Sequence, residues 1–213
     1  MQLETFGLSI AGRRANNEDA ICARPELGLF VVADGMGGYE GGEVASALAV
    51  EAIHELVRRT AGDADVTWPY KIDPTRSIIE NEVLVATRLA NERITLRRTG
   101  ELCEMGSTVV VLRLEDDHAV IGHVGDSRLY RLRAGVVTRA LGTATGEPEI
   151  ARVAVTTGDV YLLCSDGLSE VLEPVAIAQL LDQTPELACR ALIAAAYEAG
   201  SRDNISAVVV RVS

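Results

Sequence analysis

Short runs of apolar residues recur along the chain, and most of them end at Gly, Asp or Ser. They are rich in valine, isoleucine and leucine, which is typical of β-strands bounded by turns. The run that precedes Asp34 is expected to be a buried strand. The expected strands are TFGLSIAG (5–12), GLFVVAD (28–34), STVVVLRL (107–114), HAVIGHVG (118–125), SRLYRLR (127–133), DVYLLCS (159–165) and ISAVVVRV (205–212).

Helical periodicity is found in two blocks between these runs. Apolar residues recur at i, i+3, i+4 and i+7 over 41–59, and a longer helix is predicted over 73–98 with Pro74 near its start. Two shorter helices are predicted near the end of the chain, at 173–181 and 185–200. Residues 60–73 are expected to be a connecting loop.

The connections between strands predict antiparallel sheets. LEDDHAV (114–120) and GDSRLY (125–130) both have the short polar character of hairpin connections. We find no repeat, no low-complexity tract and no linker long enough to divide the chain. Residues 1–213 are therefore expected to form a single domain in which strands and paired helices are interleaved.

Composition narrows the class of protein. The chain of 213 residues is 48% hydrophobic and carries a formal net charge of −11, so nucleic acid is not expected as a partner. The four cysteines are scattered without a C-x-x-C pair, which favours reduced core thiols over zinc or disulfides. Neither a signal segment nor a membrane-length apolar run is present, and we expect a cytoplasmic protein.

Acidic residues mark the ends of several predicted strands. Asp34 ends one strand and is followed by Gly35, in VVADGMGG. Any one Asp-Gly or Asp-Asn pair is usually a turn, and read alone VVADGMGG remains open to that interpretation. Several such junctions on separate strands are harder to explain as turns. They involve Glu18, Asp19, Asp34, Asp126, Asp166 and Asp203.

Carboxylates brought together in this way require a cation among them, because they cannot all stay ionised otherwise. Oxygen ligands without a nearby histidine pattern favour Mg²⁺ or Mn²⁺ over zinc. Two such ions can activate a water and stabilise in-line displacement at phosphorus. A nucleophilic cysteine is poorly supported, since Cys164 lies in a predicted strand and no C-x5-R loop follows it.

The order of the motifs resembles the metal-dependent protein phosphatases, the bacterial type of protein phosphatase 2C-like enzyme. The resemblance extends from about residue 7 to the C-terminus and implies an α+β fold, a four-layer α-β-β-α sandwich of two antiparallel sheets flanked by helix pairs. The matching segments are RRANNEDA, VVADGMGG, MGSTVVVL, HVGDSRLY, LLCSDGL and RDNISAVVV.

The resemblance also implies roles for individual residues. Asp34 would bridge two Mn²⁺ or Mg²⁺ ions, and the carbonyl of Gly35 would bind one of them. Arg14 would bind the substrate phosphate through its planar guanidinium, with Arg13 as the register alternative. The remaining roles are Asp166 and Asp203 as ligands of the other ion, Glu18 as a ligand through water, Asp126 with Asp166 at a possible third ion, and Asp19, Asn204 and Ser165 as supporting residues.

The chain departs from the family pattern at two places. Position 36 is Met where many eukaryotic members have a histidine proposed as general acid, and bacterial members commonly have Met here. The larger departure is near 135–137, where Gly135 is followed almost at once by VVTRALG. A helical flap that family members carry between these segments is expected to be absent. Hydrolysis of small phosphate esters is therefore expected with more support than hydrolysis of phosphoproteins.

The implied activity is hydrolysis of phosphoserine and phosphothreonine in proteins by direct attack of a metal-activated water. The expected partners are substrates of a bacterial serine/threonine kinase, with no nucleic acid or membrane partner, and the chain is expected to be a monomer. A flap-less pseudophosphatase that binds phosphoproteins without turnover is the alternative. A purely structural domain with ordinary Asp turns requires the ordered motifs to be coincidental.

Overall fold

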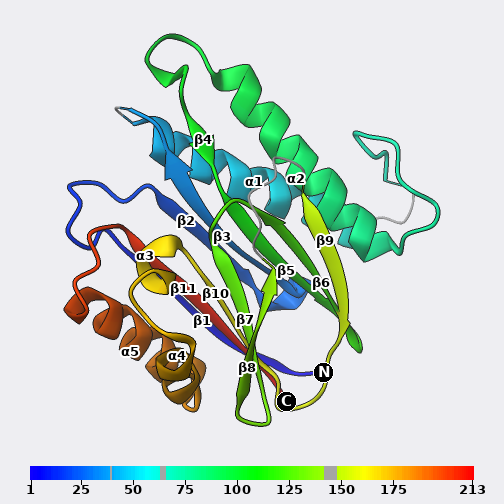
Figure 1. The fold of residues 1–213 in the computed structure, drawn as a ribbon. Coiled ribbons are helices and arrows are strands. Elements are labelled where there is room, and N and C mark those ends of the chain that lie inside the picture. The colour runs from blue at the N-terminus through cyan, green and yellow to red at the C-terminus, as the bar shows by residue number, and fades with distance from the viewer. Residues whose placement is uncertain (39, 63–65, 142–147) are drawn as a thin grey trace.

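The computed structural model describes residues 1–38, 40–62, 66–141 and 148–213. In these residues the strands form two sheets that pack face to face (Figure 1). Every pairing between the described strands is antiparallel. The first sheet has the order β1 (Leu3–Ile10), β11 (Ile205–Val212), β10 (Val160–Cys164), β7 (Arg128–Arg133), β8 (Val136–Leu141). The second has the order β2 (Asp19–Arg24), β3 (Leu29–Met36), β5 (Val109–Glu115), β6 (His118–Val124), β9 (Glu149–Ala154), and β4 (Gly106–Ser107) pairs with β3.

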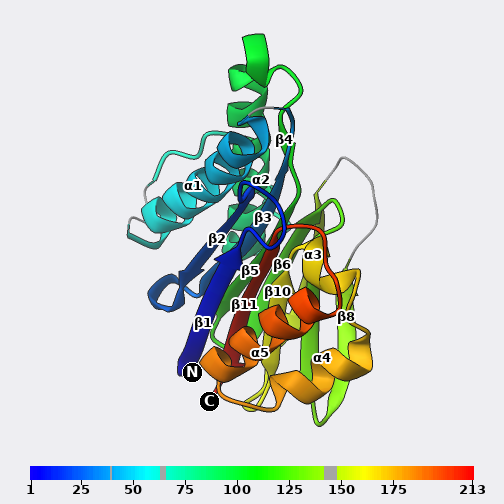
Figure 2. The same ribbon diagram turned by 90° about the vertical axis from the view of Figure 1, so that its left-hand side faces the viewer.

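Helices cover the outer face of each sheet. The helices α1 (Gly41–Gly62) and α2 (Ile78–Arg97) lie on the second sheet, and α4 (Pro174–Leu181) and α5 (Pro185–Glu198) lie on the first (Figure 2). Short helical turns occur at Pro25–Leu27, Gly100–Leu102 and α3 (Asp166–Ser169). The predicted four-layer α-β-β-α sandwich is confirmed.

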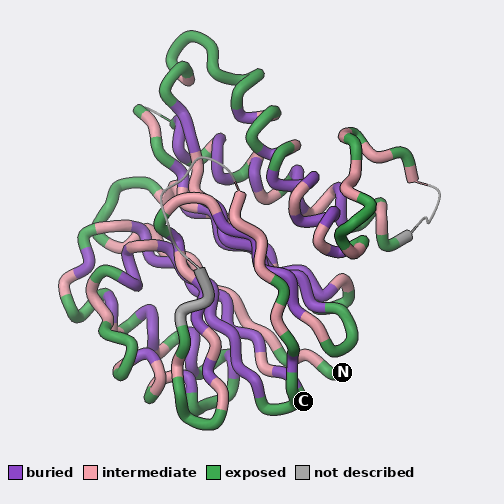
Figure 3. Tube along the Cα trace, turned by 45° about the vertical axis from the view of Figure 1, so that its right-hand side comes forward, coloured by how far each residue is buried: buried purple, intermediate pink, exposed green. Residues whose placement is uncertain are grey.

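Three apolar layers hold the sandwich together, one between the sheets and one under each helix pair. In β3, Val31 packs under α1 and α2, whereas Val32 points between the sheets. In β11, Val209 packs under α4 and α5, and Val208 points between the sheets. Such strands are buried on both faces, so their apolar residues run continuously along the sequence instead of alternating with polar ones (Figure 3).

The start of α2 differs from the prediction. The helix begins at Ile78 and not near Pro74, because Ser77 is its N-cap. The Ser77 hydroxyl accepts a hydrogen bond from the Glu80 N–H, and the Glu80 carboxylate accepts one from the Ser77 N–H. This reciprocal capping satisfies two backbone N–H groups at the start of the helix, and Pro74 lies outside it. The other three predicted helices are confirmed to within a few residues of their ends.

One of the two predicted hairpins is wrong. Residues 116–117 do join β5 to β6, with Asp116 at φ 49°. The GDSRLY segment, by contrast, carries the chain from β6 in the second sheet to β7 in the first. A short polar connection has the same composition in both cases, so the sequence does not distinguish a hairpin from a crossover. The strand expected to start near Glu18 and Asp19 is present as β2, whereas β8 and β9 were not predicted.

The segment of the expected missing flap is partly described. A two-residue turn at Ala134 and Gly135, both with positive φ, joins β7 directly to β8. The described residues between β7 and β9 form β8 and contain no helix, and residues 142–147 of this stretch lie outside the described residues. The absence of a flap stays a prediction.

Two other expectations concern membranes and thiols. No helix within the described ranges is long and apolar enough to cross a bilayer. All four cysteines are free, and Cys22, Cys164 and Cys189 are buried as expected. Cys103 is exposed, so the prediction of core thiols is wrong at that position.

Candidate metal and phosphate site

The acidic residues gather at one end of the sandwich. Asp34 lies on β3 directly opposite Asp19, the first residue of β2. Asp166 follows β10 and Asp203 precedes β11, and these two strands are antiparallel neighbours, so the end of one meets the start of the other. Asp126 lies in the crossover from β6 to β7. The predicted convergence of these carboxyl groups is therefore present in the fold.

Asp34 is held in place through hydrogen bonds to its backbone. The Thr108 N–H donates to the Asp34 carbonyl at 2.8 Å, and the Asp34 N–H donates to Thr108 Oγ1 at 3.2 Å. The Ser107 hydroxyl also donates to the Asp34 carbonyl, at 3.1 Å. Burial, followed by the neighbouring carboxylates of Asp19 and Asp166, raises the pKa of the Asp34 carboxyl to about 9.

Asp19 is buried beside Asp34 and binds two hydroxyl groups. Its Oδ2 accepts hydrogen bonds from Ser165 Oγ at 2.7 Å and from Ser206 Oγ at 2.6 Å. Its Oδ1 is buried and has no hydrogen-bond partner among the described residues. Burial raises the pKa of Asp19 to about 6, although both hydroxyl donors lower it. A buried oxygen of this kind usually has a partner, and a bound cation would supply one here.

Asp166 presents a second such oxygen. It begins α3, and its Oδ1 is buried without a partner in the described part of the chain. Burial raises the pKa of Asp166, as do the carboxylates of Asp126 and then Asp203, while a hydrogen bond with Asp34 lowers it. Asp126 is exposed, and among the neighbouring carboxylates it raises the pKa of Asp166 the most.

The two candidate phosphate-binding arginines have different partners. Arg14 donates from Nη2 to Asp203 Oδ2 at 2.7 Å and from Nε to the Arg202 carbonyl at 3.1 Å, and its side chain is 56% exposed. Arg13 stacks over the Tyr197 ring and donates to the Tyr197 carbonyl at 3.2 Å. Arg14 therefore lies at the carboxyl cluster, whereas Arg13 is engaged by the C-terminal end of α5.

Glu18 and Gly35 lie where β2, β3 and the start of α1 meet. The Gly35 N–H donates to the Glu18 carbonyl at 3.1 Å. A Cβ built on Gly35 would lie 1.9 Å from the Gly42 carbonyl oxygen, so only glycine fits there. The Glu18 carboxylate packs against Gly42 in the first turn of α1, and burial is the main cause of its raised pKa.

Asn204 ties the segment that carries Arg14 and Glu18 to β11. Its Nδ2 donates to the carbonyls of Ala11 at 3.0 Å and Asn16 at 2.8 Å. Its Oδ1 accepts from the Glu18 N–H at 2.8 Å. Asn204 thus holds this segment in place, and its supporting role at the site stays a prediction.

The donor set fits hard divalent cations. Two buried carboxylate oxygens without hydrogen-bond partners, on Asp19 and Asp166, flank Asp34, whose carboxyl is strongly destabilised in its ionised form. A cation among these oxygens would satisfy both and remove the repulsion. In the described residues no group of three or more His, Cys, Asp or Glu side chains is arranged so that it could hold a metal ion.

Several residues of the site were missed by sequence reasoning. Thr108 and Ser206 touch Asp34 and Asp19 respectively, yet each looks like an ordinary strand residue. The available signal was a hydroxyl within an otherwise apolar run, in STVVVLRL and ISAVVVRV. Cys164 is excluded as a nucleophile, since it is fully buried and burial raises its pKa to about 12.

The chain is similar to known bacterial phosphatases. The sequence profile described as "Protein phosphatase 2C" matches residues 6–149. The chain is 32% identical over 236 residues to "Serine/threonine protein phosphatase PstP" of Mycobacterium tuberculosis, covering 93% of this chain and 43% of that protein. It thus spans less than half the length of that relative. It is 24% identical to "Protein phosphatase PhpP" of Streptococcus pneumoniae, covering 94% of each.

Solved structures agree with these sequence matches. The crystal structure of the M. tuberculosis phosphatase PstP/Ppp superposes with a TM-score of 0.85 at 27% identity, covering 99% of both chains. The catalytic domain of PstP in complex with two manganese ions superposes with a TM-score of 0.84 at 28% identity, covering 99% of this chain and 98% of that one.

Proposed function

Because the chain belongs to the protein phosphatase 2C family, we propose that it hydrolyses phosphoserine and phosphothreonine in proteins with the help of two Mn²⁺ or Mg²⁺ ions. The observation that carries this proposal is the pair of partnerless buried oxygens on Asp19 and Asp166 beside Asp34, with the exposed fork of Arg14 next to them. This arrangement combines a place for cations with a group that binds phosphate.

The proposed ligands are the residues at the strand ends. Asp34 and the carbonyl of Gly35 would bind the first ion, with Asp34 shared, and Asp166 and Asp203 would bind the second. Glu18 would act through water, and Asp126 with Asp166 would hold a third ion. When bound, such ions supply a water of lowered pKa and positive charge that offsets the charge of the phosphate.

The chain's own residues orient the phosphate and its surroundings. The Arg14 guanidinium donates two parallel hydrogen bonds to phosphate oxygens once it exchanges its contact with Asp203. Asp19, fixed by Ser165 and Ser206, keeps a negative charge behind Asp34. We further propose phosphoproteins made by a bacterial serine/threonine kinase as substrates, and a cytoplasmic monomer as the working form.

The test combines turnover with binding. The purified chain is assayed for Mn²⁺-dependent hydrolysis of p-nitrophenyl phosphate and of a phosphothreonine peptide, and its Mn²⁺ affinity is measured by calorimetry. We expect turnover of the small ester at least, and loss of turnover and weaker Mn²⁺ binding in Asp34→Asn and Asp166→Asn. Asp116→Asn is the matched control, because Asp116 is exposed in the turn that follows β5, away from Asp34.

Each alternative has its own outcome. Absence of metal-dependent turnover with any substrate overturns the proposed activity. Binding of the phosphopeptide without turnover identifies the chain as a pseudophosphatase that recognises phosphoproteins. Turnover of the ester alone indicates that protein recognition depends on the flap that this chain is expected to lack.

A further inference from the structure

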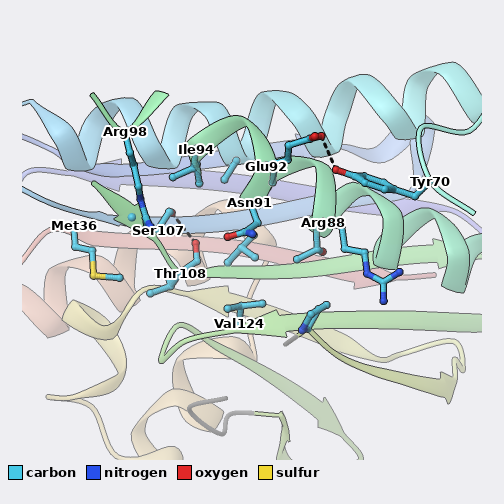
Figure 4. Close-up of a pocket in the computed structure, with 16 residues that line it drawn as sticks. Met36, Tyr70, Arg88, Asn91, Glu92, Ile94, Arg98, Ser107, Thr108 and Val124 are labelled. Atoms are coloured by element: carbon cyan, nitrogen blue, oxygen red, sulfur yellow. Dashed lines mark hydrogen bonds between the residues drawn. The ribbon is translucent and has the colours of Figure 1, made fainter. Parts of the chain in front are cut away.

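A groove with a volume of about 420 Å³ lies between α2 and the second sheet, beside β4, the start of β5 and the end of β6 (Figure 4). The α2 residues that line it are Thr87, Arg88, Ala90, Asn91, Glu92 and Ile94, together with the C-cap residue Arg98. Four of these, Thr87, Asn91, Ile94 and Arg98, follow one another at intervals of four, three and four positions and therefore share one face. Three of these four side chains are polar. The helix thus presents a largely polar face to the space beside the sheet instead of closing it by apolar packing.

One end of the groove is built from residues that hold Asp34. Ser107 and Thr108 line the groove, and both hydrogen-bond the backbone of Asp34. Met36, two residues after Asp34 on β3, also lines this end, and it is 59% exposed. Figure 4 shows Met36, Ser107 and Thr108 together at this end, with Arg88 and Tyr70 at the other. This end of the groove therefore lies beside the backbone of Asp34.

Two arginines line the groove, Arg88 and Arg98, and neither forms an ion pair among the described residues. Arg88 lines it and is exposed, and within the described residues it makes neither a hydrogen bond nor an ion pair. Arg93 on the same helix is paired with Glu55 at 2.6 Å. Arg98 donates from Nε to the Met105 carbonyl at 2.7 Å, and its terminal nitrogens are not hydrogen-bonded within the described residues.

The acidic residue of the groove is already engaged. The Glu92 carboxylate accepts a hydrogen bond from the Tyr70 hydroxyl, at the end of the groove remote from Met36. The chain as a whole carries a net charge of −11. The described lining of the groove holds two arginines and one glutamate, and this local excess of positive charge on an acidic molecule complements an acidic ligand.

We propose that this groove binds the polypeptide next to the phosphorylated residue of the substrate and that Arg88 gives it a preference for acidic side chains there. The inference rests on the proposed phosphatase function, because it needs a phosphorylated residue at the carboxyl cluster. A substrate chain leaving that cluster over Met36 enters the groove, where its acidic side chains meet Arg88 and Arg98.

Two labelled phosphothreonine peptides test the preference, one flanked on both sides by glutamate and one by glutamine. The quantity compared is the glutamate-to-glutamine ratio of kcat/KM for phosphate release, or of affinity from fluorescence anisotropy if the chain does not turn the peptides over. Since an exposed ion pair contributes at most about 1 kcal/mol, we expect a ratio of about three to five in the wild type. Arg88→Gln is expected to lower the ratio and Arg88→Glu to bring it to one or below.

Arg58→Glu is the matched control. Arg58 is exposed on α1 and does not line the groove. Its replacement by glutamate changes the net charge by the same amount as Arg88→Glu. This variant is expected to keep the wild-type ratio. That result would show that the preference for glutamate comes from the groove and not from the net charge of the molecule or from Arg14. A wild-type ratio in Arg88→Glu, or an equal fall in Arg58→Glu, overturns the inference. Hydrolysis of p-nitrophenyl phosphate by the wild type tests the phosphatase activity separately, so the two failures are distinguishable.

Discussion

Thr108 binds the backbone of Asp34 on both sides of that residue. Its N–H donates to the Asp34 carbonyl at 2.8 Å, and its Oγ1 accepts from the Asp34 N–H at 3.2 Å. The same hydroxyl lies 2.7 Å from Ser127 Oγ, and the Ser127 carbonyl lies 2.7 Å from Nε2 of the buried His123. Asp34 is therefore positioned from β5, and the crossover that carries Asp126 is tied to the same point.

Removal of this hydroxyl is expected to lower activity without unfolding the chain. Thr108→Val keeps the shape of the side chain but leaves the Asp34 N–H without its acceptor, and a lost hydrogen bond of about 1–1.5 kcal/mol corresponds to a loss in kcat/KM of roughly five- to tenfold. Thr108→Ser keeps the hydroxyl and is expected to recover most of the activity. Equal loss in both variants would contradict the role of the hydrogen bond.

The close approach at Gly35 predicts a strong effect of a single methyl group. Gly35→Ala places a Cβ 1.9 Å from the Gly42 carbonyl oxygen, which forces the start of α1 away from β3. We expect a loss of about 3 kcal/mol, seen as a melting temperature lower by roughly 6–12 °C. Gly38→Ala is the control, because no described atom lies within 4 Å of the added Cβ, and it should melt within about 1 °C of the wild type.

The buried ion pair between Glu82 and Arg113 predicts a large cost of neutralisation. Their atoms are 2.9 Å apart, and their side chains are only 3% and 8% exposed. Glu82→Gln leaves the guanidinium charge buried without its counterion, which is expected to cost about 3–5 kcal/mol of unfolding free energy. The surface pair of Glu55 and Arg93 gives the comparison, since Glu55→Gln is expected to cost less than about 1 kcal/mol. Urea titration of both variants measures the difference.

The raised pKa of Asp34 predicts that the metal-free protein loses stability as the pH rises. The folded chain holds the proton up to about pH 9, whereas the unfolded chain releases it near 3.8. Between these values the unfolded state binds fewer protons, so the free energy of unfolding falls with increasing pH. We expect the melting temperature in a chelator to fall from pH 5 to pH 9 and Mn²⁺ to reverse the fall.

Asp34→Asn provides the control for this pH dependence. The amide does not ionise, so the fall should become shallower, and the metal-free variant should melt above the metal-free wild type at pH 8. Asp19 keeps a smaller dependence in the variant, because its pKa of about 6 also lies above the unfolded value. Identical slopes in the two proteins would rule out Asp34 as the source.

The different partners of Arg14 and Arg13 predict different kinetic effects. Arg14→Ala removes the guanidinium at Asp203 and is expected to raise KM for p-nitrophenyl phosphate about tenfold, the effect of losing roughly 1.4 kcal/mol of charge-assisted hydrogen bonding. Arg13→Ala removes a stacking contact with Tyr197 and is expected to leave KM unchanged. A rise in KM with Arg13→Ala alone would reverse the assignment.

Local patterns were sufficient for the main strands and for the position of the carboxylates. The apolar run in GLFVVAD (28–34) predicted a buried strand that ends at Asp34, and β3 is such a strand, buried on both faces, although it continues to Met36. The prediction failed at Ser77, where a capping pair decided the helix start over Pro74. It also failed at Gly125–Ser127, where crossover and hairpin use the same residue types.

By itself the sequence determined which residues end strands and which of them carry a carboxylate, since strand propensity, turns and apolar periodicity are local properties. The tertiary structure alone decided what those carboxylates face. Asp19 meets Ser165 and Ser206 across 146 and 187 positions of chain, and it lies opposite Asp34 through the pairing of β2 with β3. Such contacts depend on how two sheets pack and on the burial that follows. For that reason the raised pKa of Asp34, the partnerless oxygens and the groove beside α2 became visible only in the folded chain.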